Sequence, residues 1–281
     1  MIITVTGGTG FIGNYVVKAL LDRGIEVIVT GTDIQKAREY AWFDKVNFIK
    51  LDINAQQSEE VLKKIAASDK LIHLAWSGLP NYKELFHFEE NLLPQYFFLK
   101  ELVTLGLKDI TITGTCFEYG LKEGSLEPEL PSDPQNSYAL AKDSLRKFLQ
   151  ELQKKESFKL KWLRLFYMYG EGQNSNSLIP QLNRAITNGE EYFNMSPGDQ
   201  LRDYLPVEQV AAYICTIALQ QIITGIINCC SGQPISIKQF IENYLKSINQ
   251  SVKLNPGYYP YSDLEPFAFW GDTKKLNQII K

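Results

Sequence analysis

Short runs of β-branched and aliphatic residues alternate with longer amphipathic stretches through the first half of the chain. The strand-like runs are residues 2–6, 25–30, 46–51, 70–75, 109–113 and 161–166. Helical periodicity marks residues 13–24, 59–67 and 137–150. Strands that are apolar on both faces and separated by helices are typical of a parallel sheet covered on both sides. The pattern therefore predicts an α/β fold with a doubly wound parallel sheet of the Rossmann type.

The pattern changes after about Tyr167. A loop-like stretch at 169–177 is followed by helical patterns at 178–189, 207–220 and 237–248, with short strands at 191–195 and 225–230. Ser236 is a suitable N-cap for the last of these helices. We expect residues 1–166 to form a dinucleotide-binding domain and residues 167–281 to form mainly a smaller substrate-binding lobe. This lobe is interleaved with the sheet, because segments at about 200–230 return to it.

Composition excludes several classes of partner. The chain of 281 residues is 44% hydrophobic and 22% charged, with a net charge of −3, as in ordinary globular proteins. This balance favours neither nucleic acid nor a membrane surface. The beginning of the chain lacks the features of a signal peptide, and no apolar run is long enough to span a bilayer, so we expect a cytoplasmic protein. The four cysteines and two histidines have no metal-binding spacing, so no metal is expected.

A glycine-rich turn, VTGGTGFIG, follows the first strand and opens the first helix. Gly7, Gly10 and Gly13 allow a tight turn and close approach of a pyrophosphate, whose charge the helix N-terminus meets near Phe11 and Ile12. Such turns can also simply join a strand to a helix. The strand-turn-helix context at the start of an α/β chain favours dinucleotide binding.

A tyrosine and a lysine, Tyr138 and Lys142, lie four residues apart in PQNSYALAKDSLRKFLQ. Side chains with this spacing share one face of any helix, so the spacing alone does not distinguish a catalytic pair from an ordinary amphipathic helix.

Six segments in order decide this question: the glycine loop, LIHLA, GTCFEYG, NSYALAK, RLFYMYG and LRDYLPV. Together they resemble the extended short-chain dehydrogenase/reductase family, in its nucleotide-sugar epimerase, dehydratase and reductase branch. The resemblance spans nearly the whole chain. It implies that Tyr138 is a general acid or base, that Lys142 favours its phenolate and holds the nicotinamide ribose, and that Thr115 orients the substrate carbonyl.

The same resemblance implies further binding residues. Asn91 is expected near substrate or cofactor, with simple helix-surface polarity as the alternative. Arg202 is expected to contact the diphosphate of a nucleotide sugar, or else to form a salt bridge with Asp199 or Asp203. The remaining implied cofactor contacts are Asp52, Ile53, Leu74 and Ala75, and the remaining substrate contacts are Tyr167, Asn176 and Leu178.

Three residues near these motifs, Asp52, Phe193 and His73, also have purely structural interpretations. Asp52 ends a strand, where aspartate is often only a turn former. Phe193 could stack on a base or face inward from its strand. His73 lies in an apolar strand and is expected to be a buried histidine with satisfied hydrogen bonds.

The end of the second strand bears on the choice of cofactor. NAD-using relatives carry an acidic residue there, and an ungapped count places Gly31 at that position. Without a carboxylate to repel a 2′-phosphate, Thr32, Lys36 and Arg38 could bind one. Alternatively, Asp33 takes the acidic role or caps the next helix, and the basic residues are solvated. NADP(H) is favoured over NAD(H).

These residues predict NADPH-dependent reduction of the C4 ketone of a nucleotide-linked 4-keto-6-deoxyhexose, in deoxysugar or surface-polysaccharide biosynthesis. The alternatives are an NAD-dependent 4-epimerase, a 4,6-dehydratase and a catalytically silent NADP(H)-sensing protein. Family dehydratases carry Asp-Glu directly after the catalytic threonine, where this chain has Cys116 and Phe117. In an extended segment Glu118 would point to the opposite side.

A homodimer is also expected. The helical regions 86–103 and 138–153 carry more apolar surface than one sheet face needs, and relatives commonly pair through these helices in a four-helix bundle.

Overall fold

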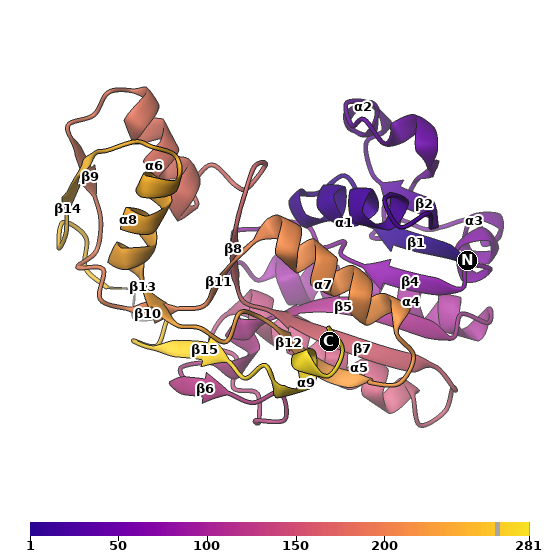
Figure 1. Ribbon diagram of the computed structural model, residues 1–281. Helices are drawn as coiled ribbons and strands as arrows, with labels where there is room; N and C mark the ends of the chain where they lie inside the picture. The colour runs from indigo at the N-terminus through magenta and orange to yellow at the C-terminus, as the bar shows by residue number, and fades with distance from the viewer. Residues whose placement is uncertain (262–264, 281) are drawn as a thin grey trace.

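The computed structural model describes residues 1–261 and 265–280 (Figure 1). Its centre is a seven-stranded sheet in the order β12-β7-β5-β4-β1-β2-β3, and every neighbouring pair is parallel. These strands are β1 (Ile2–Thr6), β2 (Glu26–Gly31), β3 (Asn47–Lys50), β4 (Lys70–His73), β5 (Asp109–Thr115), β7 (Lys159–Leu165) and β12 (Gly225–Cys229). The predicted doubly wound parallel sheet is confirmed.

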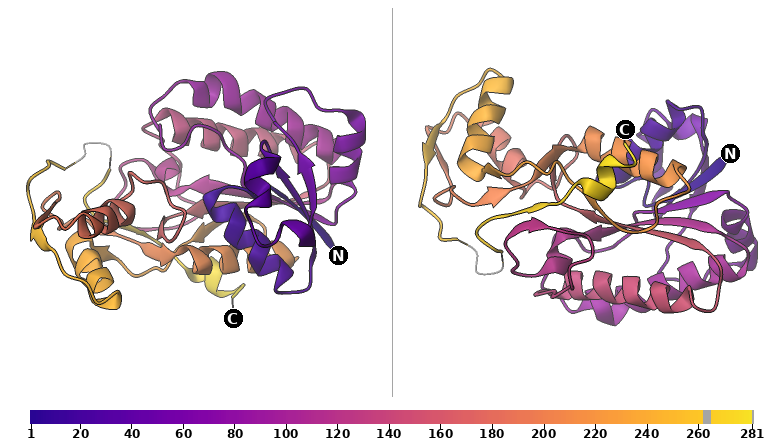
Figure 2. Two further views of the ribbon diagram at one scale, coloured as in Figure 1. Left: turned by 90° about the horizontal axis from the view of Figure 1, so that it is seen from above. Right: turned by 60° about the horizontal axis from the view of Figure 1, so that its bottom comes forward.

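Helices cover both faces of the sheet, because the central strands are apolar on both sides. All seven residues of β5 are buried. Helices α1 (Phe11–Leu21) and α7 (Val207–Leu219) pack together on one face, and α3 (Glu59–Ala66), α4 (Leu92–Thr104) and α5 (Ser137–Leu152) pack on the other (Figure 2). A π-helical turn η2 (His87–Asn91) leads into α4, and the short elements α2 (Ile34–Arg38) and η1 (Phe43–Lys45) follow β2.

A smaller lobe with its own apolar core lies beside the carboxyl ends of the strands (Figure 1). Its elements are α6 (Leu178–Thr187), α8 (Ile237–Ser247), β9 (Tyr192–Asn194) and β14 (Lys253–Asn255). Connections between lobe and sheet are made by the pairs β8 (Tyr167–Tyr169) with β11 (Tyr204–Pro206) and β10 (Leu201–Arg202) with β13 (Ile235–Ser236). Strands β6 (Gly124–Leu126) and β15 (Phe269–Gly271) pair nearby, and α9 (Lys274–Asn277) follows.

The return of the chain from lobe to sheet is visible in two elements. Helix α7 packs against α1, and β12 adds an edge strand beside β7. Among the described residues no helix has the length and apolarity needed to cross a membrane.

Candidate active site

The glycine loop forms a cradle that side chains would fill. Gly7 has a φ of +71°, and a Cβ there would lie 2.8 Å from the backbone nitrogen of Ala75. A Cβ on Gly13 would lie 2.2 Å from the carbonyl oxygen of Gly7. Both positions therefore require glycine: Gly7 because the loop packs against the backbone of Leu74 and Ala75 after β4, and Gly13 because α1 packs against the backbone of the loop itself.

The start of α1 is free to receive an anion. Gly10 is its N-cap, no side chain caps the helix, and its first turn contains no acidic residue. The backbone N–H groups of Phe11, Ile12 and Gly13 precede the first intrahelical hydrogen bond, which Asn14 donates to Gly10. Unsatisfied donors and the helix dipole suit a phosphate, so this cradle fits the pyrophosphate of a dinucleotide.

The end of β2 has no acidic side chain. A Cβ on Gly31 would lie 2.8 Å from the Thr9 hydroxyl oxygen, so Thr9 occupies the space that a larger residue would need. Asp33 caps α2, because its carboxylate accepts hydrogen bonds from the N–H groups of Gln35 and Lys36 at 2.8 and 3.3 Å. Thr32 and Arg38 are exposed, with the Arg38 guanidinium 6.0 Å from the Phe43 ring centre.

Asn91 connects the loops that follow β3 and β4. It is only 2% exposed, so it is not a surface polar residue of its helix. Its amide donates to the carbonyl of Ser77 at 3.1 Å and accepts from Asn54 at 3.2 Å. Asp52 acts as a turn former there, because its carboxylate accepts the N–H of Asn54 at 3.0 Å. Ile53 lies beside it, half-buried.

Thr115 is the last residue of β5, and the chain then turns sharply into the 3₁₀ helix η3 (Cys116–Tyr119). Its hydroxyl oxygen accepts the N–H of Phe117 at 3.3 Å, which leaves the O–H hydrogen free to donate elsewhere. Helix α5 packs against η3 and carries Tyr138 in its first turn, with Lys142 one turn further on. The structure thus brings the three predicted catalytic residues to one region.

Tyr138 is enclosed by aromatic rings. It is 8% exposed, and the ring centres of Tyr82, His87 and Trp76 lie 5.5, 5.3 and 6.1 Å from its own. This burial raises the pKa of the Tyr138 phenol well above its usual value of 10.0, so the phenol is protonated at neutral pH. Burial also lowers the pKa of Lys142 to about 7, an effect that the Glu118 carboxylate partly offsets.

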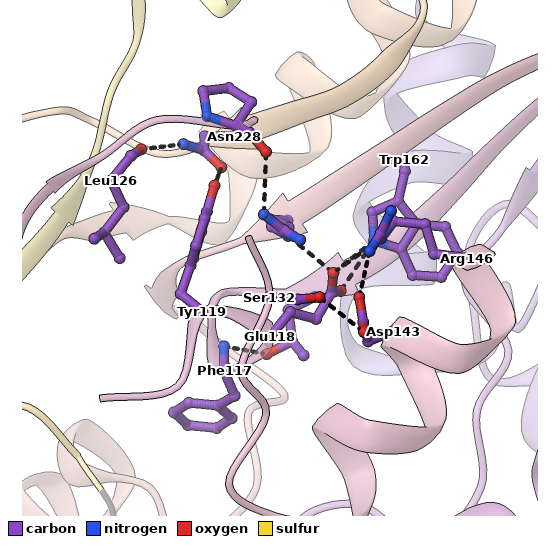
Figure 3. A network of polar contacts seen from close by, with 12 residues as sticks. Phe117, Glu118, Tyr119, Leu126, Ser132, Asp143, Arg146, Trp162 and Asn228 are labelled. Atoms are coloured by element: carbon purple, nitrogen blue, oxygen red, sulfur yellow. Dashed lines mark hydrogen bonds and ion pairs between the residues drawn. The ribbon is translucent and has the colours of Figure 1, made fainter. Parts of the chain in front are cut away.

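Glu118 is the centre of a buried polar network (Figure 3). Its carboxylate accepts hydrogen bonds from the N–H of Thr115 at 2.9 Å, from the Trp162 indole at 2.9 Å and from Arg164 at 2.8 Å. We expected Glu118 to lie opposite the site on an extended segment. That expectation applied to an extended segment, and the segment is instead helical and directs the carboxylate into the core, where it accepts the Thr115 N–H.

Arg202 is 1% exposed and already has an anionic partner. Its guanidinium donates to the Glu265 carboxylate at 2.8 Å and to the carbonyls of Leu201 and Phe267 at 2.8 and 3.1 Å. Neither expected salt bridge forms. Asp203 instead accepts the N–H groups of Ser231 and Gly232 at 2.7 and 2.9 Å, and Asp199 lies 3.4 Å from the Tyr261 hydroxyl.

Tyr167 lies beside the Arg202 guanidinium, which is 5.7 Å from its ring centre. Its buried hydroxyl has no hydrogen-bond partner within the described part of the chain. Asn176 is exposed before α6, and Leu178 is the half-buried first residue of that helix. Phe193 is 6% exposed within the core of the small lobe, so it faces inward.

A cavity of about 360 Å³ opens beside this cluster. Tyr82, which contacts Tyr138, and Phe117, which follows Thr115 by two residues, form its aromatic wall. Glu265 and Asn136 also line it, and its remaining residues are Pro80, Asn81, Lys83 and Glu84. A small polar molecule in this cavity would lie against Tyr82, whose ring centre is 5.5 Å from that of Tyr138.

Sequence analysis missed four residues of this site: Trp76, Tyr82, His87 and Glu265. For the first three, the only signal in the sequence was the concentration of aromatic residues after β4; Glu265 had no such signal. His73 was expected to be satisfied, but only its Nδ1 is, at 2.8 Å from the Thr6 hydroxyl, and its Nε2 has no partner in the described chain. Burial lowers the pKa of His73 to about 3, so this ring is neutral.

The strand order, the glycine cradle and the placement of Thr115, Tyr138 and Lys142 define a dinucleotide-binding protein of the extended short-chain dehydrogenase/reductase type. Residues 3–230 match the model of the NAD dependent epimerase/dehydratase family, and the chain belongs to this family.

Comparison with individual proteins gives the same class. The chain is 30% identical over 272 residues to a dTDP-6-deoxy-L-talose 4-dehydrogenase (NAD(+)) of Aggregatibacter actinomycetemcomitans, covering 96% of this chain and 99% of that one. It is 28% identical to a UDP-glucose 4-epimerase of Halalkalibacterium halodurans, covering 86% and 79%. Among solved structures, a UDP-N-acetylglucosamine 4-epimerase of Methanobrevibacter ruminantium in complex with UDP-N-acetylmuramic acid has a TM-score of 0.86 at 23% identity, covering 99% and 91%.

The site generates a first prediction. Tyr138→Phe removes the transferable proton and little volume, so kcat/KM should fall by about 10²–10⁴-fold while the affinity for dinucleotide is almost unchanged. Turnover is followed by the absorbance of the reduced nicotinamide, and affinity by fluorescence titration. The matched control is Tyr82→Phe, which removes a neighbouring hydroxyl and should retain activity within about tenfold. Similar losses in both variants would contradict the role of Tyr138 as acid.

Proposed function

We propose that this protein reduces the C4 ketone of a nucleotide-linked 4-keto-6-deoxyhexose to the alcohol, with NADPH as the favoured hydride source. The observation that carries this proposal is geometric: the buried Tyr138 lies one helical turn from Lys142, on the helix that packs against the end of β5, where Thr115 lies. A protonated phenol is a proton donor, which is what a developing alkoxide requires.

The reduction needs one hydride and one proton. The nicotinamide, when bound, would supply the hydride to the carbonyl carbon, and this chain supplies the proton. Tyr138 gives its phenolic proton to the carbonyl oxygen and is left as phenolate. Thr115 orients that oxygen by donating its free hydroxyl hydrogen, and the Lys142 ammonium offsets the negative charge left on Tyr138. The reverse sequence oxidises the alcohol, so the same residues serve a dehydrogenase.

Dehydration and epimerisation next to the ketone need a further acid or base. The two residues directly after Thr115, Cys116 and Phe117, do not provide one that is ionised at neutral pH. Phe117 has no exchangeable proton. Cys116 is 5% exposed, and burial raises the pKa of its thiol well above the usual value of 9.0, so it is not a thiolate at neutral pH.

A 4-epimerase is the second candidate, favoured by the relative from Halalkalibacterium that carries this name. It needs only the Thr115, Tyr138 and Lys142 that are present here. A silent sensing role is disfavoured, because such a protein has no use for a buried acid with a lysine one turn away.

On the substrate side, we propose that the nucleotide diphosphate binds at Arg202 and that the small lobe, within residues 167–281, encloses the nucleotide. A diphosphate would compete with Glu265 for the guanidinium. The unpartnered Tyr167 hydroxyl is a suitable donor nearby, and Asn176 and Leu178 border this region of the lobe.

The second prediction distinguishes these reactions. In deuterated water with excess NADPH and a 4-keto-6-deoxy nucleotide sugar, the protein should consume cofactor stoichiometrically and leave carbons 3 and 5 unlabelled in the NMR spectrum. Deuterium at either carbon would indicate a dehydratase or an epimerase acting next to the ketone. Interconversion of 4-hydroxy sugars without net loss of NADPH would indicate the 4-epimerase.

For the cofactor, we propose that NADP(H) is favoured over NAD(H), although the name of the Aggregatibacter relative specifies NAD(+). Support comes from Gly31, from the engagement of Asp33 in capping α2, and from the exposed Arg38 beyond it. Gly31, the last residue of β2, has no carboxylate to repel a 2′-phosphate, and one oxygen of the Asp33 carboxylate is engaged by the start of α2.

The third prediction concerns this cofactor choice. Because Thr9 blocks a side chain at position 31, the test uses the double variant Thr9→Ala/Gly31→Asp, with Thr9→Ala as control. The ratio of kcat/KM for NADPH over NADH should be above one in the natural protein and should fall at least about tenfold in the double variant, by charge repulsion. Arg38→Ala should lower it less. Equal kcat/KM values for NADPH and NADH in the natural protein, or a preference for NADH, would refute the proposal.

We further propose that the protein is a homodimer formed through α4 and α5. Leu93 and Phe97 on α4, with Leu140 and Phe148 on α5, are 48%, 57%, 45% and 37% exposed. The two helices pack side by side (Figure 2), and the Phe148 ring on α5 lies 5.5 Å from that of Tyr96 on α4. In the proposed dimer a second copy buries the exposed apolar side chains of both helices.

The fourth prediction follows. Light scattering at micromolar concentration should give twice the 32.1 kDa mass of the chain, and Phe97→Asp should give the monomer, because a charge would be buried in the interface. Ile222→Asp is the control, since Ile222 is 92% exposed between α7 and β12. A monomeric natural protein would refute the dimer.

A further inference from the structure

The Lys142 ammonium is surrounded by indole rings. It is 2% exposed, and within residues 1–261 and 265–280 it has neither a hydrogen bond nor a salt bridge. Its nitrogen lies 4.5 Å from the ring centre of Trp76 and 5.6 Å from that of Trp162. Both distances fall within the range in which a cation is attracted to the face of an aromatic ring.

Each indole is fixed by its own N–H group. The Trp76 indole donates to His87 Nδ1 at 3.0 Å, and His87 Nε2 lies 3.0 Å from the carbonyl oxygen of Asn81. The Trp162 indole donates to the Glu118 carboxylate at 2.9 Å. The rings therefore cannot turn away from Lys142, and the hydrogen bond to an anion makes the Trp162 ring more electron-rich.

We propose that Trp76 and Trp162 are positioning residues that hold the Lys142 ammonium between two ring faces and keep it charged without a carboxylate contact. The inference rests on the function proposed above for Lys142. A carboxylate in direct contact would occupy the N–H donors of the ammonium. Ring faces attract the charge and leave those donors free for the Tyr138 phenolate and for a ribose.

The surrounding charges agree with this arrangement. The groups that face Lys142 are Glu118 from η3, His73 from β4 and Tyr138 on its own helix. His73 is neutral and Tyr138 is protonated, so Glu118 is the only anion acting on the ammonium within the described residues, through the intervening Trp162. Burial lowers the pKa of Lys142 to about 7, and removal of a ring face should lower it further.

The test is a pH titration of tryptophan fluorescence in the protein without substrate or cofactor. The natural protein should show a transition near pH 7 that Lys142→Met abolishes. Trp42→Phe and Trp270→Phe are controls that should retain it, because neither ring lies over Lys142. In Trp76→Leu, Trp162 remains as the tryptophan next to Lys142. The midpoint of the fluorescence transition should fall by about one pH unit, which is a tenfold change in the protonation constant of Lys142. Trp76→Phe keeps a ring and should fall less.

The pH profile of kcat/KM provides a second readout. Lys142 must be charged to act. The alkaline limb of the kcat/KM profile should therefore move to lower pH in Trp76→Leu, by the same amount as the fluorescence midpoint. In Trp76→Phe it should return part of the way to its natural position. A purely structural role would lower activity at every pH without moving the limb. An unchanged midpoint in Trp76→Leu, or a transition in the natural protein that survives Lys142→Met, would overturn the proposal. Full activity of Lys142→Met would instead refute the proposed function, while the fluorescence result would still decide the ring contacts.

Discussion

The buried carboxylate of Glu118 is the constraint on which the candidate site depends. It receives hydrogen bonds from the end of β5, through the Thr115 backbone, and from β7, through Trp162 and Arg164. Arg146 on α5 lies 3.8 Å away and pairs with Asp143, so two carboxylates and two guanidinium groups balance inside the protein (Figure 3). Removing one member of a buried pair typically costs about 3–5 kcal/mol, because it leaves its partner charged and uncompensated. The relative position of strand end and helix is therefore strongly constrained.

This constraint places the proposed catalytic residues in an apolar, aromatic environment. Tyr138 and Lys142 lie on the helix that the network ties to β5 and β7, and both are almost completely buried. Burial keeps the phenol protonated and brings the lysine pKa close to neutrality, so two groups that normally titrate near pH 10 are shifted in opposite directions. Such divergent shifts are typical of a catalytic acid and its charged assistant.

The two ends of the site depend on different kinds of contact. At the dinucleotide end the backbone itself forms the cradle, and Thr9 against Gly31 leaves no room for a larger side chain. At the substrate end the contacts connect distant segments: Arg202 with Glu265, and Asp203 with the loop after β12. The contact of Asp203 with the loop after β12 links the segment that enters the small lobe to an edge strand of the sheet.

The sequence by itself determined the sheet, the glycine cradle and the Tyr138–Lys142 pair, because strand and helix periodicity and tight turns are encoded by residues close together in the chain. It did not determine the direction of Glu118, which depended on a 3₁₀ turn where an extended segment was expected. It also did not reveal that Glu265 pairs with Arg202, 63 residues earlier, or that Trp76 and Trp162 enclose Lys142. The partners of a buried charge are chosen by the packing of elements that are distant in sequence, and only the tertiary structure brings those elements together.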